Sequence, residues 1–248
     1  MIKFPENIDI KDYTLILPAV AVGNVAQLAV DLLIYNSGMK KIGQLLSPDF
    51  IPFCGANPYD KNSSEICTTA DFYIHEDKRL IVLQIRSPPL TKLVDVFNEL
   101  RDFIKARSIS KVIILTSQWQ FVRVDRQLSS NEPMRYVVSP SLELESGKTF
   151  EELGWKKLEI TNTNDTPLAI RGGGCAPSLF KFLSKENIAC ALLFRFSSEG
   201  NNSPDAKEFA RFLNQWISLL PESNKDTCWK EPPSWQHIFG PDAPVEIY

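Results

Sequence analysis

Short runs of consecutive apolar residues constrain the fold of this chain more than any other feature of its sequence. Four of these runs cover residues 13–21, 80–86, 111–117 and 188–196. A strand with one face in water alternates apolar and polar residues, whereas these runs are apolar at most positions. That pattern is typical of strands buried on both faces, as in a parallel or mixed sheet covered by helices on each side.

Stretches in which apolar residues recur at helical spacing separate these runs. They predict helices that begin near residues 25, 91, 177 and 203. We expect Asn24 to cap the first helix, with Gln27 reaching back as in a capping box, and Gly38 to end that helix. Shorter strands are predicted at residues 42–46, 66–74 and 136–139. Strands that alternate with helices in this way indicate the α/β class.

No change of composition divides residues 1–221, so we expect them to form one α/β domain. Residues 222–248 differ, because their prolines cannot continue a helix or a central strand. Three large aromatic residues of this tail, Trp229, Trp235 and Phe239, are costly to leave in water. We therefore expect the tail to dock in part on the domain or on a partner.

The last residues of the tail are Val245-Glu246-Ile247-Tyr248, after a proline-rich stem. An apolar, aromatic end of this kind suits insertion into a pocket of another protein that also captures a terminal carboxylate. The alternative is an end without a fixed structure. The residues alone leave both interpretations open.

Charge, hydropathy and cysteine usage argue against several classes of protein. The formal net charge of -3 argues against a surface that binds nucleic acid through its phosphates. The longest apolar stretch, residues 15–34, contains Pro18 and Asp31, so no membrane span is expected. The first residues lack the basic and then apolar pattern of a secretory signal. The five cysteines include no closely spaced pair, which fits reduced thiols in a cytoplasmic and nuclear protein.

Groups that carry catalysis are sparse in this sequence. The two histidines, His75 and His237, have no partner at the spacing of metal ligands. The motifs of nucleotide-binding loops and of serine hydrolases are missing as well. We therefore expect no catalytic residue, no metal and no cofactor.

The segment Gly172-Gly173-Gly174-Cys175 is the most enzyme-like feature. Glycines ahead of a helix can offer backbone N–H groups to an anion, and a helix N-terminus can stabilise the thiolate of Cys175 as a nucleophile. This alternative predicts a hydrolase- or phosphorylase-like enzyme. Three glycines equally serve a tight turn or close backbone packing, and we favour that structural turn.

A series of short motifs then becomes recognisable along the chain. In order, they are Leu17-Pro18-Ala19-Val20, Val22-Gly23-Asn24-Val25-Ala26-Gln27-Leu28-Ala29, Asp31-Leu32, Asn57-Pro58-Tyr59, Leu83-Gln84-Ile85-Arg86-Ser87, the triple glycine, Ser198-Glu199-Gly200-Asn201, Pro204-Asp205-Ala206, Pro233-Ser234-Trp235 and Phe239-Gly240. With these motifs in this order, the chain resembles the PAC2 family of proteasome assembly chaperones. The resemblance implies a three-layer α/β/α fold, similar to the phosphorylase/hydrolase-like folds, without enzymatic activity.

The resemblance also implies partners. It implies a heterodimer with proteasome assembly chaperone one, which binds the outer face of the proteasome α-subunits and promotes assembly of the 20S α-ring. Some members of the family carry a C-terminal hydrophobic–tyrosine–any-residue motif that enters pockets between α-subunits. Here Tyr248 is last and Ile247 precedes it, one residue out of step with that motif. The resemblance therefore leaves two expectations for the tail, weak insertion at the ring or insertion by the partner's terminus instead.

Overall fold

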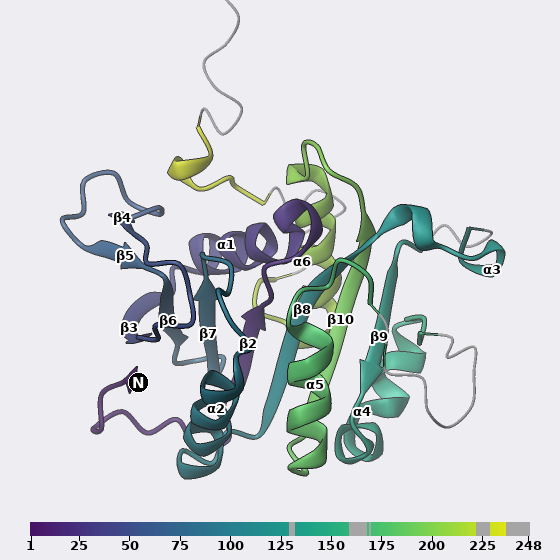
Figure 1. The fold of residues 1–248 in the computed structure, drawn as a ribbon, viewed down its shortest axis with the longest axis horizontal. Coiled ribbons are helices and arrows are strands. Elements are labelled where there is room, and N and C mark those ends of the chain that lie inside the picture. The colour runs from purple at the N-terminus through teal and green to yellow at the C-terminus, as the bar shows by residue number, and fades with distance from the viewer. Residues whose placement is uncertain (129–131, 159–167, 169, 222–228, 237–248) are drawn as a thin grey trace, which may run out of the picture.

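The structure is a computed structural model and describes residues 1–128, 132–158, 168, 170–221 and 229–236 (Figure 1). Within these residues, eight strands form one sheet: β1 (Ile2–Lys3), β2 (Thr14–Pro18), β3 (Lys40–Leu45), β6 (Ala70–His75), β7 (Leu80–Ile85), β8 (Lys111–Trp119), β9 (Met134–Val138) and β10 (Cys190–Ser197). Their order across the sheet is β1-β3-β6-β7-β2-β8-β10-β9. The four strands at its centre correspond to the four apolar runs.

The central strands β7, β2, β8 and β10 are parallel to one another. The strands β1, β3 and β6 extend the sheet on one side in antiparallel pairs, and β9 extends it on the other. Consecutive residues of a central strand, such as Leu15 and Ile16, are fully buried because each face of the sheet is covered. The prediction of a mixed sheet within an α/β fold is confirmed.

Helices form a layer on each face of the sheet. On one face lie α2 (Val94–Ala106) and α5 (Ala176–Lys185), which stand in front of the sheet in Figure 1. The other face is covered by α1 (Val25–Ser37), α4 (Pro140–Glu152) and α6 (Ser203–Ile217), whose buried residues form a second apolar cluster. A short helix, α3 (Asp125–Leu128), follows β8 in the chain. None of the helices in the described part of the chain is long and apolar enough to cross a bilayer.

Smaller elements connect these layers. The strands β4 (Cys54–Ala56) and β5 (Ile66–Thr68) pair as a separate two-stranded ribbon. Three short 3-10 helices are η1 (Val22–Asn24), η2 (Gln120–Val122) and η3 (Pro233–Trp235). The first of them joins β2 to α1, and the last lies in the tail.

Two local predictions are wrong. The run at residues 66–74 is not one strand but two, β5 and β6, because the backbone N–H and the hydroxyl of Thr68 both donate to the buried carboxylate of Asp71 and turn the chain between them. Asn24 makes no side-chain hydrogen bond as a cap and has a left-handed backbone, with φ of 52°. Gln27 does not complete a capping box, since its amide donates to the carbonyl of Ile85.

Candidate functional site

Enzymes with parallel sheets bind their ligands where the strands end at their carboxyl edge. In this chain the glycine loop, residues 172–174, packs into that edge against the segment that follows β2. A Cβ atom added to Gly174 would lie 2.2 Å from the carbonyl oxygen of Val20. A Cβ atom on Gly172 would lie 2.8 Å from the indole ring of Trp119. The glycines therefore permit close backbone packing in the space where a ligand would sit.

Hydrogen bonds hold the glycine loop in this position. The carbonyl of Gly172 accepts from the backbone N–H of Val22 at 3.0 Å. The carbonyl of Gly173 accepts from the hydroxyl of Thr116 at 2.9 Å. Gly172 and Gly174 have φ values of 85° and 58°, which side chains rarely adopt. The loop is thus a tight turn that joins β2 and β8 to α5.

Cys175, beside this loop, is a poor nucleophile. Burial raises the pKa of its thiol to about 11, although the backbone N–H of the same residue lowers it slightly. A reactive cysteine needs the opposite shift, because the thiolate is the attacking species. The geometry therefore disfavours the enzyme alternative at this position.

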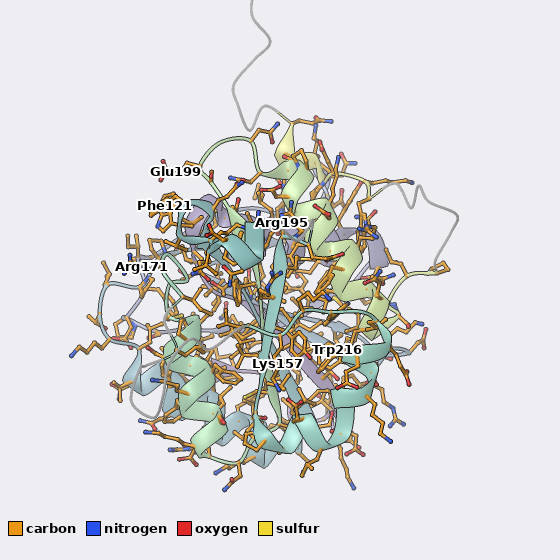
Figure 2. The ribbon with its side chains drawn as sticks, turned by 90° about the vertical axis from the view of Figure 1, so that its right-hand side faces the viewer. Phe121, Lys157, Arg171, Arg195, Glu199 and Trp216 are labelled. Atoms are coloured by element: carbon orange, nitrogen blue, oxygen red, sulfur yellow. The ribbon has the colours of Figure 1, made fainter. Side chains whose placement is uncertain are left out.

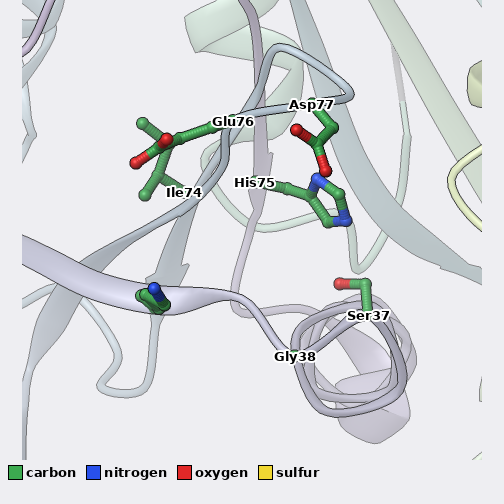
Figure 3. A pocket seen from close by; sticks show the side chains of 7 residues that line it. Ser37, Gly38, Ile74, His75, Glu76 and Asp77 are labelled. Atoms are coloured by element: carbon green, nitrogen blue, oxygen red, sulfur yellow. The ribbon is translucent and has the colours of Figure 1, made fainter.

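One polar pocket, of about 200 Å³, lies between the end of α1 and the turn after β6 (Figure 3). His75 lies between Ser37 and the carboxylate of Asp77, and its Nδ1 accepts a weak hydrogen bond of 3.4 Å from the backbone N–H of Lys78. Glu76 points away from the imidazole in Figure 3. Among the described residues, no three histidine, cysteine or carboxylate side chains group closely enough to hold a metal ion.

Four motif residues meet in a buried polar cluster between α1, β7 and the loop after β4. Asp31 of α1 accepts hydrogen bonds from the hydroxyl of Tyr59 at 2.6 Å, from Gln84 at 2.7 Å and from Arg86 at 3.0 Å. Arg86 also donates to the hydroxyl of Tyr59 at 2.9 Å. The side chains of Arg86 and Asp31 are 15% and 8% exposed, so the ion pair is largely removed from water. We name these four residues the polar cluster.

Electrostatics ties the polar cluster together. Burial alone would lower the pKa of Arg86, but the adjacent carboxylate of Asp31, together with Tyr59 and Tyr73, outweighs the effect of burial and raises the pKa. Burial, together with Asp31, raises the pKa of Tyr59 well above its usual value. The cluster therefore holds one matched positive and negative charge and a neutral phenol. The polar cluster is therefore a structural interaction, which holds the loop that carries Tyr59 against the sheet.

A second set of charges lies on the side of the molecule that faces the viewer in Figure 2. Arg195 of β10 pairs with Asp205 at 2.8 Å and with Glu208 at 2.6 Å, both on α6. The hydroxyl of Ser197 donates to Asp205 at 2.9 Å. The guanidinium of Arg195 thus joins α6 to the sheet through two carboxylates.

Residues 229–236 of the tail form what we name the strap, which runs over α1, α6 and the loop after β4. Trp229 and Trp235 are 5% and 6% exposed and belong to the apolar cluster of α1 and α6. The other tail residues that the sequence singles out, Phe239 and residues 245–248, lie outside the described residues.

An exposed apolar surface lies beside the ribbon of β4 and β5. Two chain segments form it and are joined by hydrogen bonds, from the N–H of Ile51 to the carbonyl of Pro88 at 3.2 Å and from the N–H of Leu90 to the carbonyl of Asp49 at 2.7 Å. Its large apolar side chains are between 39% and 59% exposed: Leu46, Ile51, Phe53, Leu90 and Val94. We name these five residues the apolar face. Large apolar side chains that gather on a surface mark contacts with other molecules.

Sequence reasoning missed both the polar cluster and the apolar face. The members of the polar cluster come from three separate motifs, and nothing in their local sequence shows that they meet. The apolar face comes from segments with several prolines, Pro48, Pro52, Pro88 and Pro89, which read as loops. Large apolar residues placed between prolines, where neither a helix nor a central strand can form to bury them, are a signal that could have identified it.

The fold and the glycine loop, which occupies the carboxyl edge of the parallel strands, define a class of protein. It is a three-layer α/β/α chain whose glycine loop is a structural turn and whose exposed apolar face is suited to contacts with other polypeptides. Within that class, the chain belongs to the PAC2 family, whose model matches residues 15–217.

Curated relatives extend this similarity over nearly the whole chain. It is 39% identical to proteasome assembly chaperone 2 of Danio rerio, over 96% of this chain and 95% of the relative. It is 35% identical to proteasome assembly chaperone 2 of Homo sapiens, over 97% and 96%.

Solved structures support the fold. PbaA of Pyrococcus furiosus, described as an archaeal homolog of proteasome-assembly chaperone, matches with a TM-score of 0.65 at 18% identity, over 91% of this chain and 88% of that chain. PbaB of the same organism, described as an archaeal proteasome activator, matches with a TM-score of 0.65 at 19% identity, over 90% of both chains. At these identities the two structures establish similarity of fold alone.

Proposed function

We propose that this protein is a non-enzymatic chaperone of proteasome assembly. In this proposal it forms a heterodimer with proteasome assembly chaperone one, and the pair binds proteasome α-subunits and promotes assembly of the 20S α-ring. The observation that carries the proposal is the similarity to relatives named proteasome assembly chaperone 2, which extends over 96% of the chain. We further propose that it acts in the cytoplasm and the nucleus.

The glycine loop and Cys175 favour this proposal over the enzyme alternative. A hydrolase or phosphorylase would need an open anion site at Gly172–Gly174, but backbone and side-chain atoms of Val20 and Trp119 already lie there. It would also need a thiol that ionises near neutral pH, whereas the pKa of Cys175 is raised to about 11. A protein that binds other polypeptides needs neither.

Two surfaces could supply the two kinds of contact. We propose that the apolar face pairs with the partner chaperone, because permanent interfaces are rich in exposed apolar side chains. We propose that residues 222–248 form a tail whose last residues, Val245–Tyr248, contact the α-subunits, while residues 1–221 form the chaperone domain. The strap would then connect the domain to the ring-binding end.

Co-expression with proteasome assembly chaperone one of the same organism tests the proposal. We expect a stable one-to-one complex that captures α-subunits, whereas the chain expressed alone should self-associate. Deletion of Ile247 and Tyr248 should weaken capture of α-subunits and leave the heterodimer intact. A folded chain that captures neither partner nor α-subunits would refute the proposed function.

A further inference from the structure

The strap is held by specific contacts as well as by its two tryptophans. The side-chain amide of Asn36 on α1 both donates to the carbonyl of Lys230 and accepts from its N–H, each at 2.9 Å. The side chain of Asn36 thus pairs with both backbone groups of Lys230, as the backbone of a neighbouring strand would in a sheet. Glu231 adds an ion pair of 2.7 Å with Lys207 of α6.

The far end of the strap rests on the loop after β4. The N–H of Ser234 donates to the carbonyl of Pro58 at 3.2 Å, and Lys61 donates to the side chain of Gln236. This loop is itself immobilised, because the next residue, Tyr59, belongs to the polar cluster. The position of Gln236 is therefore fixed relative to the sheet through a continuous set of contacts.

A second asparagine marks the point where the chain leaves α6. The side chain of Asn214 donates to the carbonyl of Leu220 at 3.0 Å and accepts from its N–H at 2.9 Å. Asn214 and Asn36 thus hold the backbone on either side of residues 222–228 in the same way. If the strap alone were released, Leu220 would be the last fixed point before the end of the tail.

We propose that the strap is an anchoring element, which fixes where the ring-binding end of the tail begins and so restricts which part of a partner surface Val245–Tyr248 can reach. This inference rests on the proposed function. Eight residues, 237–244, separate Gln236 from Val245, and when fully extended they span about 27 Å. Release of the strap would leave Leu220 as the last fixed residue, so that 24 residues, 221–244, would separate it from Val245, three times as many.

The cost of a longer connection follows from effective concentration. For a connection already long enough to reach its site, effective concentration falls with roughly the −3/2 power of its length. Release of the strap, which lengthens the connection from 8 to 24 residues, should therefore weaken binding by about fivefold. An insertion of 16 glycine and serine residues between Gln236 and His237 gives the same length and should have the same effect, and an insertion of 32 should weaken binding by about elevenfold.

The test measures the affinity of the full heterodimer for proteasome α-subunits. The variants are the two insertions, the double substitution Trp229→Ala with Trp235→Ala to release the strap, and Tyr248→Ser to remove the contact itself. Ser37→Ala on α1 is a control that keeps Asn36 and both tryptophans in place, because its hydroxyl bonds to Leu33 of the same helix. Hydrogen exchange at the N–H of Lys230 reports whether the strap is seated, and we expect faster exchange in the double variant only.

The outcomes distinguish the anchoring role of the strap from the proposed function of the protein. A graded loss with insertion length, matched by the double variant, supports the anchoring role. If Tyr248→Ser weakens binding while the insertions and the double variant do not, the anchoring role is wrong and the proposed function stands. If Tyr248→Ser has no effect, the tail contact and the anchoring role both fail. Capture of α-subunits then still decides whether the chain is an assembly chaperone.

Discussion

At the scale of single residues, Gly174 shows how the glycine loop serves packing. Its φ is 58°, and an added Cβ atom would lie 2.2 Å from a backbone oxygen, which cannot move aside as a flexible side chain would. We expect Gly174→Ala to lower the free energy of unfolding by about 2–4 kcal/mol, from the left-handed backbone and overpacking together. Denaturant unfolding measures this change.

Gly38 provides the matched control for Gly174. It has a similar φ of 65°, but an added Cβ atom would meet nothing within 4 Å. Gly38→Ala should therefore lower the free energy of unfolding only through the strain of its left-handed backbone, by about 1 kcal/mol. Equal losses of stability in the two variants would show that Gly174 is not closely packed, and the glycine loop would again be a candidate ligand site.

The thiol of Cys175 links the same loop to pH. Its pKa is raised to about 11 in the folded chain from an ordinary value of 9.0, so its contribution to stability is present below pH 9 and is lost as pH rises towards 11. We expect the stability difference between the wild type and Cys175→Ala to shrink by about 2 kcal/mol between pH 8 and pH 11. Unfolding curves at several pH values measure it. A difference that does not change with pH would contradict the burial of this thiol.

At the scale of elements, the polar cluster joins a helix, a strand and a loop. Asp31→Ala leaves the largely buried guanidinium of Arg86 without its carboxylate, and breaking a buried pair from one side costs about 3–5 kcal/mol. The loop that carries Tyr59 should become more mobile as well, because the hydroxyl of Tyr59 loses the carboxylate of Asp31 as its acceptor. Thermal or denaturant unfolding measures the loss.

An exposed ion pair is the control for the polar cluster. Lys157 and Glu143 lie 2.8 Å apart, and their side chains are 53% and 42% exposed. Since water screens such a pair, Glu143→Ala should cost less than about 1 kcal/mol. If Asp31→Ala lowers the free energy of unfolding no more than Glu143→Ala does, the polar cluster does not hold these elements together.

The elements also show which parts of the fold the sequence can predict. The central strands were predictable because burial on both faces leaves a continuous apolar run, as in β8. The helix α4 was not predicted, because its apolar residues are few and one of them, Leu144, is 91% exposed. The capping box failed because Gln27 bonds to β7, which is 58 residues away in sequence. Local patterns identify elements, whereas contacts between distant segments decide individual side chains.

At the scale of the whole molecule, the same limit applies to the candidate site. Motif order was enough to indicate the family, since it depends only on the sequence. The convergence of Asp31, Tyr59, Gln84 and Arg86 was not, because it depends on α1, β7 and a loop meeting in space. The strap contacts join residues up to 194 positions apart, which no local signal encodes.

The apolar face gives the prediction that concerns the molecule as one partner of a complex. Leu90 is 59% exposed, so Leu90→Glu should change the stability of the isolated chain by less than about 0.5 kcal/mol. In the proposed heterodimer the same carboxylate would be buried among apolar side chains without a partner charge. We therefore expect at least a tenfold loss of affinity for proteasome assembly chaperone one, measured by titration of the purified chains.

Leu144 is the matched control for this face, because it is 91% exposed on α4, at the opposite end of the sheet from β3 (Figure 1). Leu144→Glu introduces the same charge on a leucine that is even more exposed than Leu90, and we expect it to leave pairing unchanged. A larger loss from Leu144→Glu than from Leu90→Glu would move the interface to the α4 side of the molecule. Loss in neither variant would mean that pairing uses a surface other than these two. Because both substitutions are on exposed side chains, a loss in only one variant reports the position of the partner and not the folding of the chain.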